Sequence, residues 1–287
     1  MQTWFRIGAL AGVLGAGSAL AQGDRTAELT VIHGISDLPA PVDVFVDGAF
    51  QFSFEFTDIV GGIELPGGTY ELEVRLLGDP VLSATATLEA GGNFTAIAHE
   101  TFIEGPASGI ALALFENDAS TVRGPLGRLT ARHTADAPEV DITLSIGDTT
   151  CVWREGLSNP QGGSPTQAGP ISAVSLPFDV TFFPAGGADG VFAVPGVQPT
   201  PAVSTIAYAV GSLPRGTFTV LLQTIETGED GVAVFGDLNG DGVVDIADLD
   251  VLISLFGTSD RTGDLDGDGI VTIFDAIILI ELIVGRG

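Results

Sequence analysis

The chain has no lysine and a single cysteine. Its ten basic residues are therefore all arginine, and they stand against 37 acidic residues for a net charge of −27. Such a chain repels nucleic-acid phosphates and anionic lipid, so neither nucleic acid nor a lipid surface is expected as a partner. Cys151 has no second cysteine to pair with, so stability must come from packing and from bound metal rather than from a disulfide.

No apolar run is long enough for a comfortable membrane span. The N-terminus instead combines Arg6, an apolar run from Ile7 to Gly17, and an A-x-A site that ends at Ala21. This pattern is typical of a secretory signal peptide over residues 1–21, with a mature chain that starts at Gln22. The alternative is a buried N-terminal strand or helix. We expect a protein that is secreted or held at the cell surface, with no membrane span.

Helix caps and a 3.6-residue apolar period are missing from residues 27–223. Short β-branched and aromatic runs alternate there with Gly, Pro and Asp turns. This arrangement predicts antiparallel β-sandwiches.

An internal repeat divides this β-rich region. Residues 31–48 return as 131–148, which aligns His33 with His133 and Asp37 with Asp136. Farther along the chain, "TAIAH" aligns with "TIAYA", and 13 extra residues in the second copy fall in the Gly/Pro/Ser-rich "SNPQGGSPTQAGP". The repeat predicts two tandem sandwiches. Their ranges are 27–126 and 127–228.

The first copy carries the segments "HGISDLPAPVDVFVDG", "LPGGTY" and "GNFT". They resemble the secreted bacterial domain of unknown function 4397, an immunoglobulin-like sandwich, and the resemblance extends over residues 27–225. In the second copy Asp179 and Val180 replace Gly68 and Thr69 of the motif. The resemblance implies a fold and no activity.

The histidines and aspartates of the repeat could form base-and-orienter pairs, His33 with Asp37 and His133 with Asp136. The simpler interpretation is structural, because an Asp in such a turn caps it and a strand-end His bonds backbone. No Ser or Cys nucleophile stands in an elbow motif.

The C-terminal residues contain two acidic boxes, "DLNGDGVVDIAD" and "DLDGDGIVTIFD", that start 27 residues apart. Side-chain oxygens at positions 1, 3 and 5, glycine at 6, a backbone carbonyl at 7 and a carboxylate at 12 define the EF-hand calcium loop. The boxes therefore predict two Ca²⁺ ions, the alternative being a pair of Asx turns. The predicted ligands are Asp237, Asn239, Asp241, Val243, Asp245 and Asp248, then Asp264, Asp266, Asp268, Ile270, Thr272 and Asp275.

Each box is followed by a single amphipathic segment, "IADLDVLISLF" or "IFDAIILIELIV", and neither is preceded by a good helix. A loop with one following helix, duplicated within residues 236–287, resembles a type I dockerin. The resemblance implies a cohesin-type partner, with contacts at positions 10 and 11 of each loop, which are Ile246, Ala247, Ile273 and Phe274. The alternative for these apolar residues is packing between the two helices.

The sequence thus predicts a mainly β protein, with two tandem antiparallel immunoglobulin-like sandwiches and a small helical calcium module. We expect a non-catalytic binding or assembly protein that docks through its tail onto a cohesin-type, cell-surface or matrix protein. The alternative is a secreted polysaccharide-active hydrolase that carries a dockerin, in which case extracellular polysaccharide is the partner.

Overall fold

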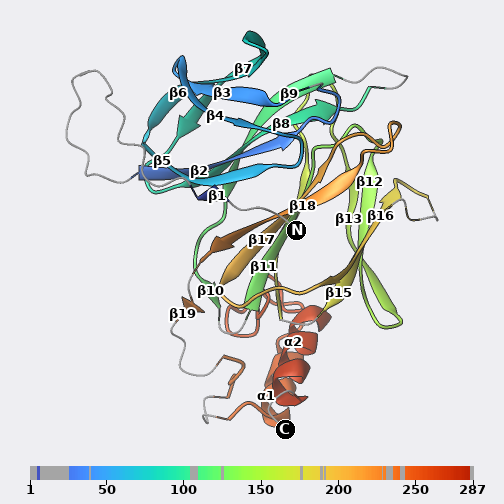
Figure 1. The fold of residues 1–287 in the computed structure, drawn as a ribbon. Helices are drawn as coiled ribbons and strands as arrows, with labels where there is room; N and C mark the ends of the chain where they lie inside the picture. The colour runs from blue at the N-terminus through green and yellow to red at the C-terminus, as the bar shows by residue number, and fades with distance from the viewer. Residues whose placement is uncertain are drawn as a thin grey trace.

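The computed structural model describes residues 5–6, 26–38, 40–103, 109–123, 126–174, 177–187, 190, 192–227, 229–230, 235–239 and 243–284. Figure 1 shows two β-sandwiches and a helical tail, coloured from blue through green and orange to red along the chain. Most of the predicted signal peptide, its cleavage site, and Asp241 lie outside the described residues. No helix in the described ranges is long and apolar enough to cross a membrane.

The first sandwich consists of a five-stranded sheet, β1-β5-β2-β8-β9, and a four-stranded sheet, β4-β3-β6-β7. The strands are β1 (Phe5–Arg6), β2 (Thr26–Gly34), β3 (Val42–Val46), β4 (Ala49–Phe54), β5 (Ile59–Pro66), β6 (Gly68–Leu76), β7 (Asp79–Leu88), β8 (Asn93–Thr101) and β9 (Gly109–Asn117). Neighbouring strands are antiparallel except β1 with β5 and β2 with β8, which are parallel.

Alternation of side chains along the strands builds the core of the first sandwich. Leu29 and Val31 of β2 point inward and meet Val44 and Leu72 of the opposite sheet in one buried cluster. The intervening Ile32 belongs to a different cluster on the other face of β2. Strand β2 is therefore buried on both faces, which is why its second half is apolar or small almost without interruption.

The second sandwich has two four-stranded sheets, β14-β11-β17-β18 and β13-β12-β15-β16. The strands are β11 (Leu126–His133), β12 (Val140–Ile146), β13 (Thr149–Leu157), β14 (Gln167–Val174), β15 (Phe178–Pro184), β16 (Phe192–Val197), β17 (Val203–Val210) and β18 (Thr219–Glu226). Apart from β1, which has no counterpart among the described strands, the strand orders of the two sandwiches correspond, β2 with β11 through β9 with β18. The mainly β fold with two tandem sandwiches is as predicted.

The pairing register corrects one alignment within the repeat. His33 pairs with Ala98 across the parallel β2 and β8, and His133 pairs with Ala209 across β11 and β17. Ala98 therefore corresponds to Ala209, one residue later than the predicted match of "TAIAH" with "TIAYA". Both segments consist mainly of Ala, Ile and Thr, so their composition did not distinguish registers that differ by one residue, although such a shift exchanges the two faces.

The two sandwiches pack sheet against sheet through the outer faces of corresponding sheets. Ile32 and Ile97 of the first meet Ile206, Tyr208 and Leu221 of the second in one buried cluster. Because these faces are covered, β8 is buried along its whole length. The two sandwiches therefore share a buried apolar interface.

Several polar groups buried at this interface are paired across it. Gln223 accepts a hydrogen bond from Thr95 Oγ1 at 2.9 Å and donates one to Thr30 Oγ1 at 3.1 Å. Arg132 donates to Asn117 Oδ1 at 2.7 Å, and its guanidinium lies 4.2 Å from the ring centroid of Phe115. Burial of such groups without partners would cost several kcal/mol, so these pairs favour the observed docking geometry.

The tail contains two helices, α1 (Ile246–Ser254) and α2 (Ile273–Val284), and it is tied to the β region by a short parallel pair, β10 (Val122–Arg123) with β19 (Glu229–Asp230). Asp245 begins α1 as its N-cap and accepts a hydrogen bond from Ala247 N. Figure 1 shows both helices on one side of the second sandwich. Their shared core includes Leu252 and Leu279.

Candidate metal centre

The second acidic loop gathers three carboxylates. Oxygens of Asp264, Asp266 and Asp268 all lie within 4.8 Å of one another. Two glycine amides orient the first of them, with Gly267 N donating to Asp264 Oδ1 at 2.9 Å and Gly269 N to Oδ2 at 3.1 Å. Gly269, at position 6, has a φ of +95°, a left-handed conformation that a side chain would strain. The predicted sharp turn is thus present at this glycine.

Crowding of these acids has an electrostatic consequence. The pKa of Asp266 is raised to about 7, first because burial disfavours the charged carboxylate. A hydrogen bond from Asp268 N lowers this pKa, and repulsion by the charges of Asp275, Asp268 and Asp264 raises it further. A cation among these oxygens would offset both the burial and the repulsion.

The carboxylate at position 12 joins the start of the loop to its helix. Asp275 is buried, and its Oδ1 accepts hydrogen bonds from Leu265 N at 2.6 Å and Asp266 N at 3.1 Å. Its Oδ2 accepts one from Thr272 N at 2.6 Å. Asp275 is not part of the three-carboxylate cluster, although its charge is close enough to act on Asp266. Its carboxylate already organises the loop through amide hydrogen bonds.

The first loop repeats this arrangement where it is described. Asp248 Oδ1 accepts from Leu238 N at 2.8 Å and Asn239 N at 3.1 Å, and Oδ2 accepts from Asp245 N at 2.8 Å. Asp237, at position 1, is half-buried, and Asn239 is exposed. Because Asp241 lies outside the described residues, the grouping of positions 1, 3 and 5 is visible only in the second loop.

Positions 7 and 9 have distinct roles. The side chains of Val243 and Ile270, at position 7, are exposed, which suits residues predicted to contribute only a carbonyl oxygen. At position 9, Asp245 and Thr272 accept hydrogen bonds from the first-turn amides Ala247 N and Phe274 N. Position 9 thus caps each helix, a role that the calcium pattern alone did not include.

The donor set of the second loop fits a hard divalent cation. Several carboxylate oxygens converge, and no cysteine or histidine lies in the loop to favour a softer metal. Asp264, Asp266 and Asp268 would hold Ca²⁺ directly, while the buried Asp275 secures the loop around it.

The predicted partner-binding residues lie on the surface of the tail. Ile246 is 66% exposed, Ile273 58% and Phe274 46%, and Ala247 is exposed as well. The helices instead pack through other side chains, including Leu252 and Leu279. The alternative that the four residues form the contact between the helices is therefore wrong.

The histidines of the repeat bond backbone, in agreement with the structural interpretation. His33 Nδ1 accepts from Ile35 N at 3.2 Å, and His133 Nε2 donates to Pro138 O at 3.0 Å. Asp37 is exposed, whereas the buried Asp136 accepts from Ser212 Oγ at 2.8 Å.

An ionic cluster of two buried carboxylates with a more exposed arginine, at the interface of the sandwiches, was not predicted. Arg215 Nη2 lies 2.8 Å from Glu100 Oε1 and 3.6 Å from Asp136 Oδ2. Glu100 also accepts hydrogen bonds from Ser36 N at 3.0 Å and Ser36 Oγ at 3.1 Å. The scarcity of basic residues could have indicated this cluster in the sequence, because a buried acid in this chain has only ten arginines as possible counter-ions. These carboxylates are engaged by Arg215 and serine rather than free for acid–base work.

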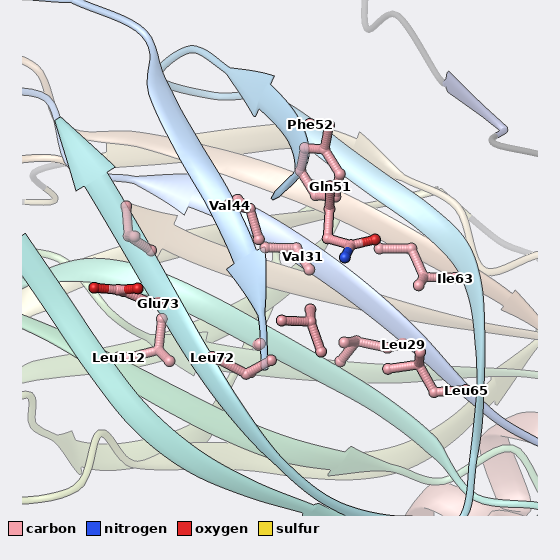
Figure 2. A pocket seen from close by; sticks show the side chains of 13 residues that line it. Leu29, Val31, Val44, Gln51, Phe52, Ile63, Leu65, Leu72, Glu73 and Leu112 are labelled. Carbon is pink, nitrogen blue, oxygen red and sulfur yellow. The ribbon is translucent and has the colours of Figure 1, made fainter. Parts of the chain in front are cut away.

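Two hollows occur in the first sandwich. Figure 2 shows a cavity of about 20 Å³ between its sheets, lined mainly by aliphatic side chains such as Val31, Val44 and Leu72, with Gln51 and Glu73 at its border. It has room for about one water molecule. A wider open hollow of about 580 Å³ borders Gly91 to Asn93 and Glu116 to Ser120. Asn93 and Asn117 in its wall bond each other, so these amides are already partnered.

Part of the β region is similar to a known family. Residues 27–143 match the model of a family described as Domain of unknown function (DUF4397). The match spans the first sandwich, β11 and the first half of β12 in the second, so it supports the predicted resemblance over that range. No dockerin domain is detected in the tail, and no curated protein matches the chain.

Proposed function

We propose that this is a secreted, non-catalytic binding or assembly protein. Its tail, residues 236–287, folds around two Ca²⁺ ions and docks onto a cohesin-type domain or another cell-surface or matrix protein. The sandwiches form a rigid body that carries this docking module.

One observation carries the proposal: apolar side chains are concentrated on the surface of the tail. Ten of the sixteen exposed large hydrophobic residues in the described ranges lie between Val243 and Val284. On α2 they include Ile273, Ile277, Ile280 and Val284, which recur every three or four residues along one side of the helix. Contiguous apolar surface of this kind marks interaction sites in soluble proteins.

The arrangement of this exposed apolar surface is expected to depend on bound calcium. Seven of these ten residues sit on helices whose N-termini are held by the loops, since Asp248 and Asp275 bond the loop amides and lie in the first helical turns. Closing the loops around metal would therefore position the two apolar helix surfaces together. The partner is expected to offer an apolar patch with a basic border, because Arg261 is the sole basic residue in the described part of the tail.

Binding of the full-length secreted chain to a cohesin-type domain, and to proteins extracted from the cell surface, tests the proposal. We expect retention in millimolar calcium and release by chelator. The double variant Ile246→Asp with Ile273→Asp should lose binding while it still takes up calcium.

Val152→Asp is the matched control, because Val152 is a large exposed apolar residue on β13 of the second sandwich. Retention that is equal with chelator, or equal for the tail double variant and this control, would contradict the proposal.

A further inference from the structure

The apolar core of the tail is not self-contained. Val122 and Leu126, which lie where the chain passes from the first sandwich to the second, are almost completely buried in the same cluster as Leu252 and Leu279 of the helices. The tail thus encloses part of the connection between the sandwiches.

The same cluster contains residues of the acidic loops themselves. Val244 and Val271 stand at position 8 of each loop, and Leu265 at position 2 of the second. Their burial depends on how the loops close. The loops and the connection between the sandwiches therefore share one core.

Backbone pairing strengthens this link. Strand β10 pairs in parallel with β19, with Val122 opposite Glu229. Leu126 begins β11, lies opposite Val174 of β14, and accepts a hydrogen bond from Ala202 N at 3.0 Å. Leu126 consequently belongs both to the tail core and to a sheet of the second sandwich.

The other half of the connection is held by the sandwich. Arg128 of β11 donates to the carbonyl oxygens of Asp118 at 2.9 Å and Ser120 at 3.1 Å, and it pairs with the Asp118 carboxylate at 3.2 Å. Residues 118–120 thus have an anchor of their own, whereas the side chains of Val122 and Leu126 are covered by the tail core.

We infer that calcium in the tail braces the connection between the two sandwiches, so that metal release loosens Val122 and the start of β11 together with the tail. This inference rests on the proposed calcium function. Without metal, the crowded carboxylates repel, the loops open, and Val244, Leu265 and Val271 leave the shared core. Val122 and Leu126 then lose their apolar cover. With metal bound, the docking surface keeps one orientation relative to the sandwiches.

Amide hydrogen exchange of the full-length chain, with calcium and with chelator, tests the inference. On chelation we expect exchange at Val122 and Leu126 to accelerate about ten-fold or more together with α1 and α2, while β3 in the first sandwich stays unchanged. Acceleration confined to the helices would overturn the inference and leave the proposed calcium function intact. Unchanged exchange everywhere would overturn both.

A matched pair of variants tests whether the start of β11 affects calcium binding in the tail, because coupling between two sites is reciprocal. Leu126 and Leu129 are both buried leucines of β11, but Leu126 packs in the tail core and Leu129 in the core of the second sandwich. Leu126→Ala should raise the calcium concentration at half-saturation by about three- to ten-fold, which corresponds to about 0.7–1.4 kcal/mol of coupling, whereas Leu129→Ala should leave it within about two-fold. Equal midpoints for the two variants would refute the coupling.

Discussion

Arg215 of the second sandwich forms an ion pair of 2.8 Å with Glu100 of the first, whose side chain is completely buried. Glu100 lies on β8 and Arg215 in the turn before β18, so the pair joins corresponding sheets of the two copies. A buried carboxylate without a counter-charge is strongly unfavourable, so this contact opposes separation of the sandwiches.

Replacement of that arginine is the first prediction. Arg215→Ala should lower the free energy of unfolding by about 3 kcal/mol, because it leaves the Glu100 charge buried without its partner. Urea unfolding at neutral pH measures the loss. Arg75→Ala is the control, since Arg75 forms a pair of similar length with Glu73, whose side chain remains 18% exposed where that of Glu100 is completely buried. Its effect should be small, and equal losses in the two variants would contradict the role assigned to the buried pair.

Calcium removal should unfold the tail before the sandwiches. We expect calcium to raise the melting temperature of the helical signal in circular dichroism, and Asp237→Ala with Asp264→Ala to abolish the increase. Asp250→Ala should retain it, because Asp250 is an exposed acid of α1 outside both loops. A melt that chelator leaves unchanged in the parent chain would refute the metal assignment.

Acid should destabilise the folded chain through its buried histidines. Burial lowers the pKa of His33 and of His99 to about 4, from an ordinary 6.5, and it lowers the pKa of His133 as well. Because the pKa of these histidines is lower in the folded chain, the unfolded chain takes up protons at a higher pH than the folded chain does. The stabilisation is therefore complete above pH 6.5 and is lost as the pH falls toward 4, by about 2 kcal/mol at pH 5 for each of His33 and His99.

His33→Gln tests this origin of the pH dependence. The amide oxygen can replace Nδ1 as the acceptor for Ile35 N and does not titrate. Urea midpoints measured between pH 7 and 4.5 should fall less steeply in the variant than in the parent. Identical slopes would assign the acid sensitivity to other groups.

Adjacent residues of α1 should differ sharply in their effect on the tail. Leu252 is fully buried and Ile253 is 53% exposed. Leu252→Ala should destabilise the calcium-loaded tail by about 2–4 kcal/mol, and Ile253→Ala by less than about 0.5 kcal/mol. Denaturant unfolding followed by the helical signal compares them. A large loss for Ile253→Ala would show that its side chain is covered in the free protein.

Local patterns predicted much of the architecture. Alternation and turn residues indicated the sandwiches, and the repeat of 31–48 in 131–148 indicated two copies, because both signals reside in neighbouring residues. The apolar period of α1 was less informative. Leu249, Leu252, Ile253 and Phe256 have the spacing of a buried face, yet Ile253 and Phe256 are exposed. Spacing places residues on one side of a helix without stating whether another element covers it.

The candidate metal site also has features that the sequence predicted and features that it did not. The box spacing predicted that Asp264, Asp266 and Asp268 converge, since the ligands and the turn glycine occur within twelve consecutive residues. The N-cap role of Thr272 and the inclusion of Leu126 in the tail core were not predicted. The core contact joins residues more than a hundred positions apart, and no local pattern encodes it.

By itself the sequence determined the mainly β class, the duplication and the acidic loops, because each depends on residues close together in the chain. Only the tertiary structure decided that equivalent outer faces of the two sandwiches pack together, that Arg215 neutralises Glu100 between them, and that the tail core includes Leu126. The physical reason is that burial and charge pairing depend on which distant surfaces meet, and this is settled only when the whole chain has folded.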